Sequence, residues 1–264
     1  MIVDVHAHFY TEQSGRADWQ RLNERRLEVG DRIGIRYHVA SILGSWGRWS
    51  PTYMSSREDV THANTRMIEL ARSRPDRIRG YCVVNPNFPE HAQDELRRGF
   101  DAGMIGVKLA ASRRADDPLL DAVAGFAGEH HAPMLHHVWQ RRRRDWPGQE
   151  ASDALELCAL ARRHPGTSFL LAHIGGGGDW AHSLRAVRAV PNVYVDLSGS
   201  GVDAGMMESV LDAVGVGRMV WGADVTLDTG LAKLRYLSTL IAPADVERVT
   251  GANARAIFPP GVLE

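Results

Sequence analysis

The chain has 264 residues, of which 44% are hydrophobic and 24% are charged, a composition typical of a soluble globular protein with a sizeable core. Its 31 basic residues nearly balance its 32 acidic residues. The overall charge therefore gives no reason to expect a nucleic-acid partner.

The cysteines and the apolar runs indicate the compartment. Neither Cys82 nor Cys158 has a ligand-like neighbour, so we expect buried free thiols and a reducing environment. A predicted strand starts at the first residues, and no apolar run approaches the length of about 18 residues that a membrane span needs. We therefore expect a cytoplasmic protein without a membrane partner.

The first stretch, residues 2–8, reads Ile-Val-Asp-Val-His-Ala-His and predicts a strand. Alternation along a strand places Asp4, His6 and His8 on one face. The two imidazoles then lie about 6 to 7 Å apart at the backbone, close enough to bind one ion. A polar edge strand or a surface coincidence is the alternative, because the chain has 12 histidines.

The rest of the chain alternates short apolar runs with amphipathic stretches. The apolar runs predict strands at residues 38–44, 79–85, 103–109, 133–137, 168–173, 193–197 and 218–222. The amphipathic stretches predict helices at residues 19–29, 59–73, 90–102, 117–131, 150–164, 180–190, 203–214, 227–240 and 243–258. Alternation about every 30 residues predicts an α/β fold, a single (β/α)8 TIM barrel over residues 1–264. A doubly wound sheet is the alternative, but His-x-His stands where that fold has a glycine-rich phosphate turn.

Residues of ligand type lie at the predicted strand ends: His6, His8, Lys108, His136, His137, His173 and Asp224. In a TIM barrel the carboxyl ends of all strands meet at one mouth, where the chemistry of the fold takes place. Several imidazoles with a carboxylate are suitable ligands for Zn or another divalent first-row metal. We therefore expect a metal site at the C-terminal mouth of the strands.

Short motifs accompany these residues in order along the whole chain: Asp4-Val-His-Ala-His8, Gly106-Val-Lys-Leu109, Pro133-Met-Leu-His136, Leu171-Ala-His-Ile-Gly-Gly176, Val195-Asp-Leu-Ser198, Trp221-Gly-Ala-Asp224 and Asn253-Ala-Arg-Ala-Ile-Phe258. With them the sequence resembles the amidohydrolase superfamily. It is most similar to the branch of compact hydrolases and non-oxidative decarboxylases that includes aminocarboxymuconate semialdehyde decarboxylase. Members often have Gly-Ser-Asp-x-Pro after strand eight, whereas this chain has Gly222-Ala-Asp-Val-Thr226, which changes the expected pocket wall near Val225.

The resemblance implies roles for single residues. It makes His6, His8, His136 and Asp224 the metal ligands and His173 a catalytic histidine beside the metal. It also implies one divalent ion per chain, for which we expect Zn, with Mn as the alternative.

Two positions beside the expected ligands have other roles. His137 follows His136 in the same predicted strand, so we expect it to point the opposite way, as a packing or supporting residue. In some members of the superfamily a lysine at the position of Lys108 is carbamylated and bridges two metals, which makes Lys108 a candidate bridge to a second metal. A neutral or ion-paired structural lysine is the alternative.

The candidate substrate-binding residues are Trp46, Trp139 and Arg141, all in predicted loops. Aromatic side chains in loops at a barrel mouth can line a pocket, and plain packing of the loop is the alternative. Arg141 starts a run of arginines, most of which we expect to be solvated. One arginine of this run is a candidate to bind a substrate carboxylate with two parallel N–H groups of its guanidinium.

These observations predict an enzyme that acts on a small molecule. The leading hypothesis is a metal-dependent hydrolase of an amide, ester or lactone, in which Asp224 takes a proton from a metal-activated water and His173 polarises the reacting oxygen. The first alternative is metal-dependent non-oxidative decarboxylation of a small aromatic or unsaturated carboxylic acid at the same ligands. The second is a metal-binding barrel without catalysis. A homodimer is one oligomeric state that the sequence allows.

Overall fold

The computed structural model describes residues 1–44, 54–109, 112–138, 152–174, 179–199, 201 and 203–264. Within these residues, eight parallel strands hydrogen-bond in chain order. They are β1 (Ile2–His8), β2 (Ile35–Ser41), β3 (Ile78–Val84), β4 (Gly106–Leu109), β5 (Met134–His136), β6 (Phe169–Leu171), β7 (Val193–Asp196) and β8 (Met219–Val220). The Val5 N–H donates to the Trp221 carbonyl (3.1 Å), and the Asp224 N–H donates to the His6 carbonyl (2.6 Å). These bonds join the first strand to the segment around the last, so the predicted (β/α)8 barrel is confirmed.

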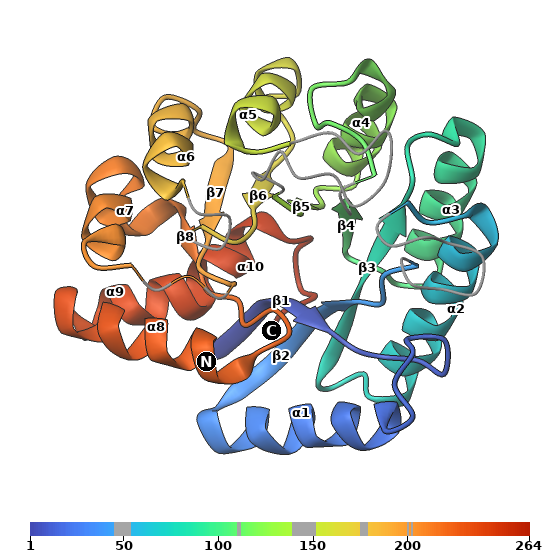
Figure 1. Ribbon diagram of the computed structural model, residues 1–264, viewed down its shortest axis with the longest axis horizontal. Coiled ribbons are helices and arrows are strands. Elements are labelled where there is room, and N and C mark those ends of the chain that lie inside the picture. The colour runs from blue at the N-terminus through green and yellow to red at the C-terminus, as the bar shows by residue number, and fades with distance from the viewer. Residues whose placement is uncertain (45–53, 110–111, 139–151, 175–178, 200, 202) are drawn as a thin grey trace.

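Helices follow the strands and surround them. They are α1 (Trp19–Ile33), α2 (Arg57–Ser73), α3 (Pro89–Asp101), α4 (Asp121–Glu129), α5 (Ala154–Arg163), α6 (Trp180–Val187), α7 (Met206–Val214), α8 (Leu227–Leu240), α9 (Pro243–Glu247) and α10 (Asn253–Ile257). Figure 1 shows α1 to α8 in a ring around the strands. No helix in the described ranges has the length and apolarity that a bilayer crossing requires.

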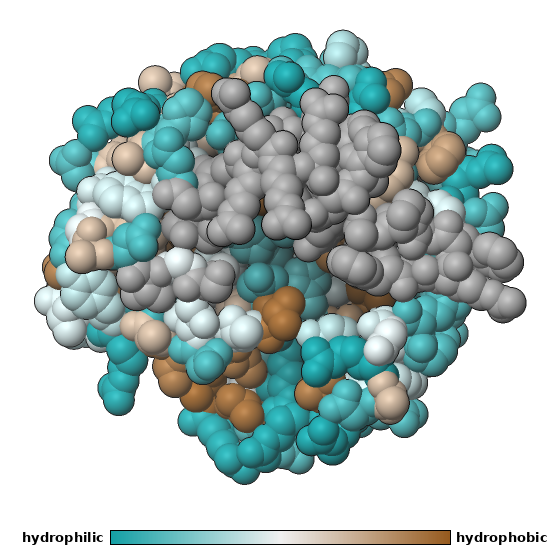
Figure 2. All heavy atoms as spheres, in the orientation of Figure 1, coloured by the Kyte–Doolittle hydropathy of each residue, from teal (hydrophilic) through white to brown (hydrophobic). Residues whose placement is uncertain are grey.

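Two apolar layers stabilise the barrel. Val5, Val39 and Leu170 belong to a cluster inside the barrel, and Ala40 and Trp221 belong to a larger cluster between the strands and the helices. All five side chains are buried. Apolar side chains fill the interior of the barrel. In this fold the functional polar side chains lie at the carboxyl ends of the strands. Figure 2 shows a hollow at the centre of one face with hydrophilic side chains at its floor.

The C-terminal segment closes part of the barrel interior. The predicted helix at residues 243–258 is divided into α9, a π-helical turn at Arg248–Ala252, and α10. A Cβ atom at Gly251 would lie 2.5 Å from the Met1 carbonyl oxygen, so this turn packs closely against the start of the chain. Ile257 of α10 joins the cluster inside the barrel.

Strand β2 begins at Ile35, earlier than the predicted range 38–44. Gly34 ends α1 in the left-handed conformation (φ 84°), and its N–H donates to the carbonyls of Gly30 and Asp31. The strand starts directly after this cap. The charged Arg36 interrupts the apolar pattern there, which is why the sequence predicts a later start.

A β-bulge interrupts the alternation along β1. Asp4 pairs with His38, and Ala7 pairs with Ala40. Strand β1 therefore has one more residue between these two pairs than β2 has. As a result the side chain of Asp4 lies against Arg26 of α1, while His6 contacts residues at the carboxyl ends of the strands. The prediction that Asp4 shares a face with His6 and His8 is therefore wrong.

Candidate metal centre

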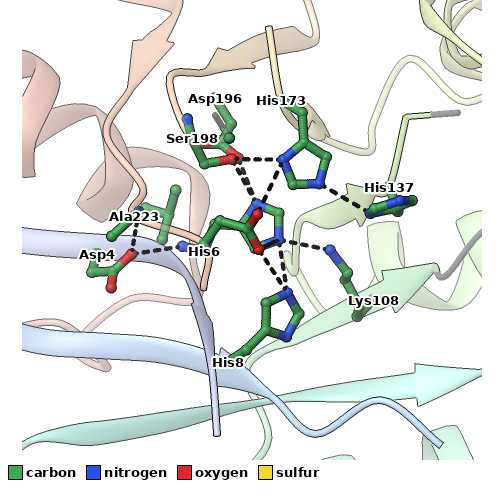
Figure 3. Close-up of polar contacts among 12 residues, drawn as sticks. Asp4, His6, His8, Lys108, His137, His173, Asp196, Ser198 and Ala223 are labelled. Atoms are coloured by element: carbon green, nitrogen blue, oxygen red, sulfur yellow. Dashed lines mark hydrogen bonds and ion pairs between the residues drawn. The ribbon is translucent and has the colours of Figure 1, made fainter. Parts of the chain in front are cut away.

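His6 is held by two residues at the end of β7. Its Nδ1 lies 2.7 Å from Oδ2 of Asp196 and 2.9 Å from Oγ of Ser198 (Figure 3). The Ser198 hydroxyl also donates to the Asp196 carboxylate. With Nδ1–H donating to Asp196, the lone pair of His6 is on Nε2, the arrangement in which carboxylates orient metal-ligating histidines.

His8 and Asp224 both lie near Nε2 of His6. His8 Nε2 is 3.2 Å from His6 Nε2 and 3.2 Å from Oδ1 of Asp224. Two nitrogen ligands at about 2.0 to 2.1 Å from a tetrahedral ion lie about 3.4 Å apart, close to the separation of the two Nε2 atoms. Asp224 has a left-handed backbone (φ 57°), which is rare for a residue with a side chain.

His173 completes a group of ligand atoms. It follows β6, also has a left-handed backbone (φ 61°), and places Nδ1 3.7 Å from Oδ2 of Asp224. Ligand atoms of His6, His173 and Asp224 all lie within 4.8 Å of one another. Imidazole nitrogen and carboxylate oxygen are the donors that divalent first-row metals accept, so these residues fit a metal ion.

The two histidines near the end of β5 are placed opposite to the sequence prediction. His136 Nε2 lies 2.9 Å from Oγ of Ser152, so this nitrogen is directed toward the segment before α5. His137 Nδ1 lies 3.0 Å from Nε2 of His173. The predicted orientations of His136 and His137 are therefore wrong, because the strand alternates with Leu135, not His136, facing the barrel interior.

Lys108 of β4 also faces the centre. Its Nζ lies 2.9 Å from His6 Nε2, and its side chain is fully buried. Burial lowers the pKa of Lys108 to about 8, against the opposing charges of Asp224 and Asp196. The amine is thus in place beside a candidate ligand, while its role as a bridge to a second metal stays a prediction.

The electrostatics of the group favour metal binding at neutral pH. Burial lowers the pKa of His6 and of His173 well below the ordinary value, so both imidazoles are neutral. Burial raises the pKa of Asp224, but the hydrogen bond with His8 and the neighbouring His6 and His173 side chains outweigh it and hold that pKa well below its usual range. Neutral imidazoles and an ionised carboxylate are the protonation states that ligate a metal.

The sequence did not predict two residues that contact His6, and three predicted residues cannot be placed. Asp196 and Ser198 had no predicted role, although Val195-Asp-Leu-Ser198 lies at a strand end like the other motifs. Asp196 is fully buried, and burial raises its pKa to about 7. The candidate substrate-binding residues Trp46, Trp139 and Arg141 lie outside the described residues.

The profile of the family described as "Amidohydrolase" matches residues 3–259. The chain belongs to the amidohydrolase family. Among curated members, gamma-resorcylate decarboxylase of Rhizobium sp. (strain MTP-10005) is 23% identical over 300 residues, which cover 91% of this chain and 90% of that protein.

Solved structures of similar proteins have the same fold. The crystal structure of 2,6-dihydroxybenzoate decarboxylase complexed with 2,6-dihydroxybenzoate has a TM-score of 0.73 at 18% identity, with 97% of this chain and 98% of that chain covered. The dihydroxybenzoic acid decarboxylase of Polaromonas sp. JS666, with bound manganese and the inhibitor 2-nitroresorcinol, has a TM-score of 0.74 at 18% identity, with 97% and 96% covered. At these identities the likeness shows the fold.

The comparisons correct the leading functional hypothesis. These three relatives are decarboxylases of aromatic acids. The prediction of a hydrolase of an amide, ester or lactone is therefore wrong, and the alternative of decarboxylation agrees with the relatives.

Proposed function

We propose that this protein is a metal-dependent non-oxidative decarboxylase of a small hydroxylated aromatic carboxylic acid. The observation that carries the proposal is the grouping of His6, His173 and Asp224 within 4.8 Å of one another, in a chain whose curated relatives are gamma-resorcylate decarboxylases. The dihydroxybenzoate and nitroresorcinol in the related structures support an aromatic ring with hydroxyl groups as the substrate class.

The residues that would hold the divalent ion are His6, His8, His137 and Asp224, while His173, whose nitrogen also lies in the group of three, is assigned to proton transfer. This set keeps three of the four ligands implied by the sequence resemblance and replaces His136 with His137, which lies against His173. When bound, the ion supplies positive charge for the oxygens of the substrate. Manganese in the related Polaromonas structure makes Mn the first ion to test, with Zn second, and one ion per chain is expected.

The pair of His173 and Asp224 would move the proton that the reaction needs. The bond from the ring to the carboxylate breaks with its electron pair left on the ring carbon, CO2 leaves, and that carbon takes up a proton. His173 Nδ1 lies 3.7 Å from Asp224 Oδ2 and 3.3 Å from the Ser198 hydroxyl, so one proton can pass along this group to the ring carbon. Asp224 is 21% exposed, so solvent reaches this pair.

The test uses the metal-loaded chain on a panel of hydroxybenzoates, lactones, esters and amides. We expect CO2 and the decarboxylated phenol from a hydroxybenzoate, with one solvent deuterium in the product when the reaction runs in D2O. Acid release from a lactone, ester or amide without CO2 would overturn the proposal. Metal binding without turnover of any compound would instead favour a non-catalytic metal-binding barrel.

The variants His173→Asn and His131→Asn form a matched pair for this assay. Both residues are histidines with a left-handed backbone, with φ of 61° and 50°. His131 is exposed and lies before β5, away from the carboxyl ends of the strands. We expect the His173 variant to lose about 10²- to 10³-fold in rate, as for one removed electrostatic group, and the His131 variant to keep its rate.

A further inference from the structure

The left-handed backbone of Asp224 needs support. A non-glycine residue in this region is strained and persists only where its surroundings hold it. Arg26 of α1 supplies such a hold, because its Nη1 donates to the main-chain carbonyl of Asp224 (2.7 Å). Arg26 is only 8% exposed, so this bond is shielded from water.

The other nitrogen of the same guanidinium binds a buried carboxylate. Arg26 Nη2 donates to Oδ2 of Asp4 (2.7 Å), and Asp4 is fully buried. Oδ1 of Asp4 accepts from the main-chain N–H of Ala223 (2.9 Å) and of His6 (3.2 Å), as Figure 3 shows. The ion pair of Arg26 and Asp4 therefore contacts the backbone of His6, Ala223 and Asp224 at once.

The packing of α1 is adapted to this ion pair. His38 Nδ1 lies 3.1 Å from Oδ2 of Asp4. Gly30 of α1 leaves room for this ring, since a Cβ atom there would lie 2.5 Å from His38 Nε2. A buried ion pair is weak evidence for stability, because desolvation offsets much of the attraction and apolar side chains often stabilise as well. Apolar side chains could match the contribution of this ion pair to folding. They could not reproduce its hydrogen bonds to the backbone of His6, Ala223 and Asp224.

We propose that Arg26 and Asp4 are positioning residues that fix His6 relative to Asp224 and thereby set the affinity of the site for its divalent ion. The inference rests on the proposed function only in taking His6 and Asp224 as ligands of the ion. Arg26 joins the site to α1 through its bonds to the Asp4 carboxylate and the main-chain carbonyl of Asp224.

The test compares Arg26→Lys and Arg26→Gln with Arg25→Gln. Arg25 is the matched control, because it is an exposed arginine on the same helix and pairs with Glu28 at the surface. Amide hydrogen exchange across residues 220–226 is measured in the metal-free chain, and Mn(II) affinity is measured by titration with MnCl2. We expect both Arg26 variants to exchange faster around Ala223 and Asp224 and to bind Mn(II) about 10- to 100-fold more weakly, the usual effect of losing a group that orients a ligand. The Arg25 variant should match the parent chain.

Rescue gives a third measurement. Arg26→Ala leaves space for a free guanidinium ion, and added guanidinium at low millimolar concentration should restore part of the Mn(II) affinity of this variant and none in Arg25→Ala. Parent-like exchange and Mn(II) affinity in the Arg26→Lys and Arg26→Gln chains, with only a lower melting temperature, would overturn the proposal. None of these three measurements uses a substrate. A chain that behaves as expected here but releases no CO2 would overturn the proposed function alone.

Discussion

His173 places its Nε2 atom 3.0 Å from Nδ1 of His137, so the ends of β6 and β5 bring two imidazoles together. The rings meet edge to face, with centroids 4.7 Å apart. His136, the preceding residue, instead has its Nε2 2.9 Å from the hydroxyl of Ser152, just before α5. The adjacent residues His136 and His137 thus contact different parts of the molecule: His136 contacts Ser152, and His137 contacts His173.

This difference predicts opposite effects of the same substitution at neighbouring positions. His137→Asn should weaken Mn(II) binding and decarboxylation at least about 10-fold, because it removes an imidazole that we propose as a ligand. His136→Asn should bind Mn(II) normally and lose about 1 kcal/mol of stability with its hydrogen bond to Ser152. Metal titration and urea unfolding of both variants check the prediction, and a loss of metal in His136→Asn alone would reverse the assignment.

The number of metal ions bound per chain tests whether Lys108 bridges two metals. If the site holds one ion, Lys108→Met should keep one equivalent of Mn, since the amine lies beside His6 Nε2 without being a required ligand. Elemental analysis of the parent chain and the variant measures this ratio. A ratio near two in the parent chain that falls to one in the variant would show that Lys108 bridges a second metal as a carbamate.

The sequence predicted the order of the strands and much of the site for a physical reason. Apolar runs and amphipathic helices determine the barrel, and the barrel brings every strand end to one mouth. The location of His6, His8, His173 and Asp224 at this mouth could be predicted on this basis, while their roles stay predictions that come from the family resemblance. Each of these residues directly follows or ends an apolar run.

Side-chain direction could not be predicted as well. The rule of alternation fails at the bulge between Asp4 and Ala7, which leaves no mark in the residue types. In β5, Met134 and Leu135 are both buried, one on each face, so no alternation of polar and apolar residues shows which histidine faces inward. Contacts across the chain, such as that from Arg26 to Asp224, depend on tertiary packing and have no local pattern.

Acid should destabilise the contact between α2 and α3 through Glu95. Burial raises the pKa of this carboxylate, but hydrogen bonds from Arg98, Asn64 and Thr61 outweigh it, so the pKa of Glu95 is lower in the folded chain than its ordinary value of 4.5. The stabilisation is therefore complete above about pH 4.5 and is lost as the pH falls through the lower folded value.

Glu95→Gln tests this dependence. The variant should be less stable by about 1.5 to 3 kcal/mol at pH 7, because bonds to a charged group are lost, and the difference from the parent chain should shrink below pH 4.5. Urea unfolding between pH 7 and pH 3 measures it. Asp94→Asn is the control, since Asp94 is 73% exposed and pairs with Arg97 on the same helix. A constant difference at all pH values would contradict the prediction.

Gly199 and Gly205 offer a matched pair for the position of His173. Both glycines are left-handed, with φ of 87° and 80°, so alanine adds backbone strain of about 1 kcal/mol at either position. A Cβ atom at Gly199 would lie 3.1 Å from Cβ and Nδ1 of His173, whereas one at Gly205 meets nothing within 4 Å. Lys233 of α8 donates to the carbonyls of Ser198 (2.9 Å) and Gly199 (3.0 Å), so the segment with Gly199 is held and the ring of His173 has to move.

Gly199→Ala should therefore lower kcat for decarboxylation by about 10- to 100-fold, since small displacements of reacting groups are costly, while KM changes little. Gly205→Ala should lose a similar amount of stability and keep its kcat. Thermal unfolding and steady-state kinetics of both variants separate strain from displacement. Equal kcat values in the two variants, at equal loss of stability, would show that the ring of His173 tolerates the added methyl group and that its present position is not required for the reaction.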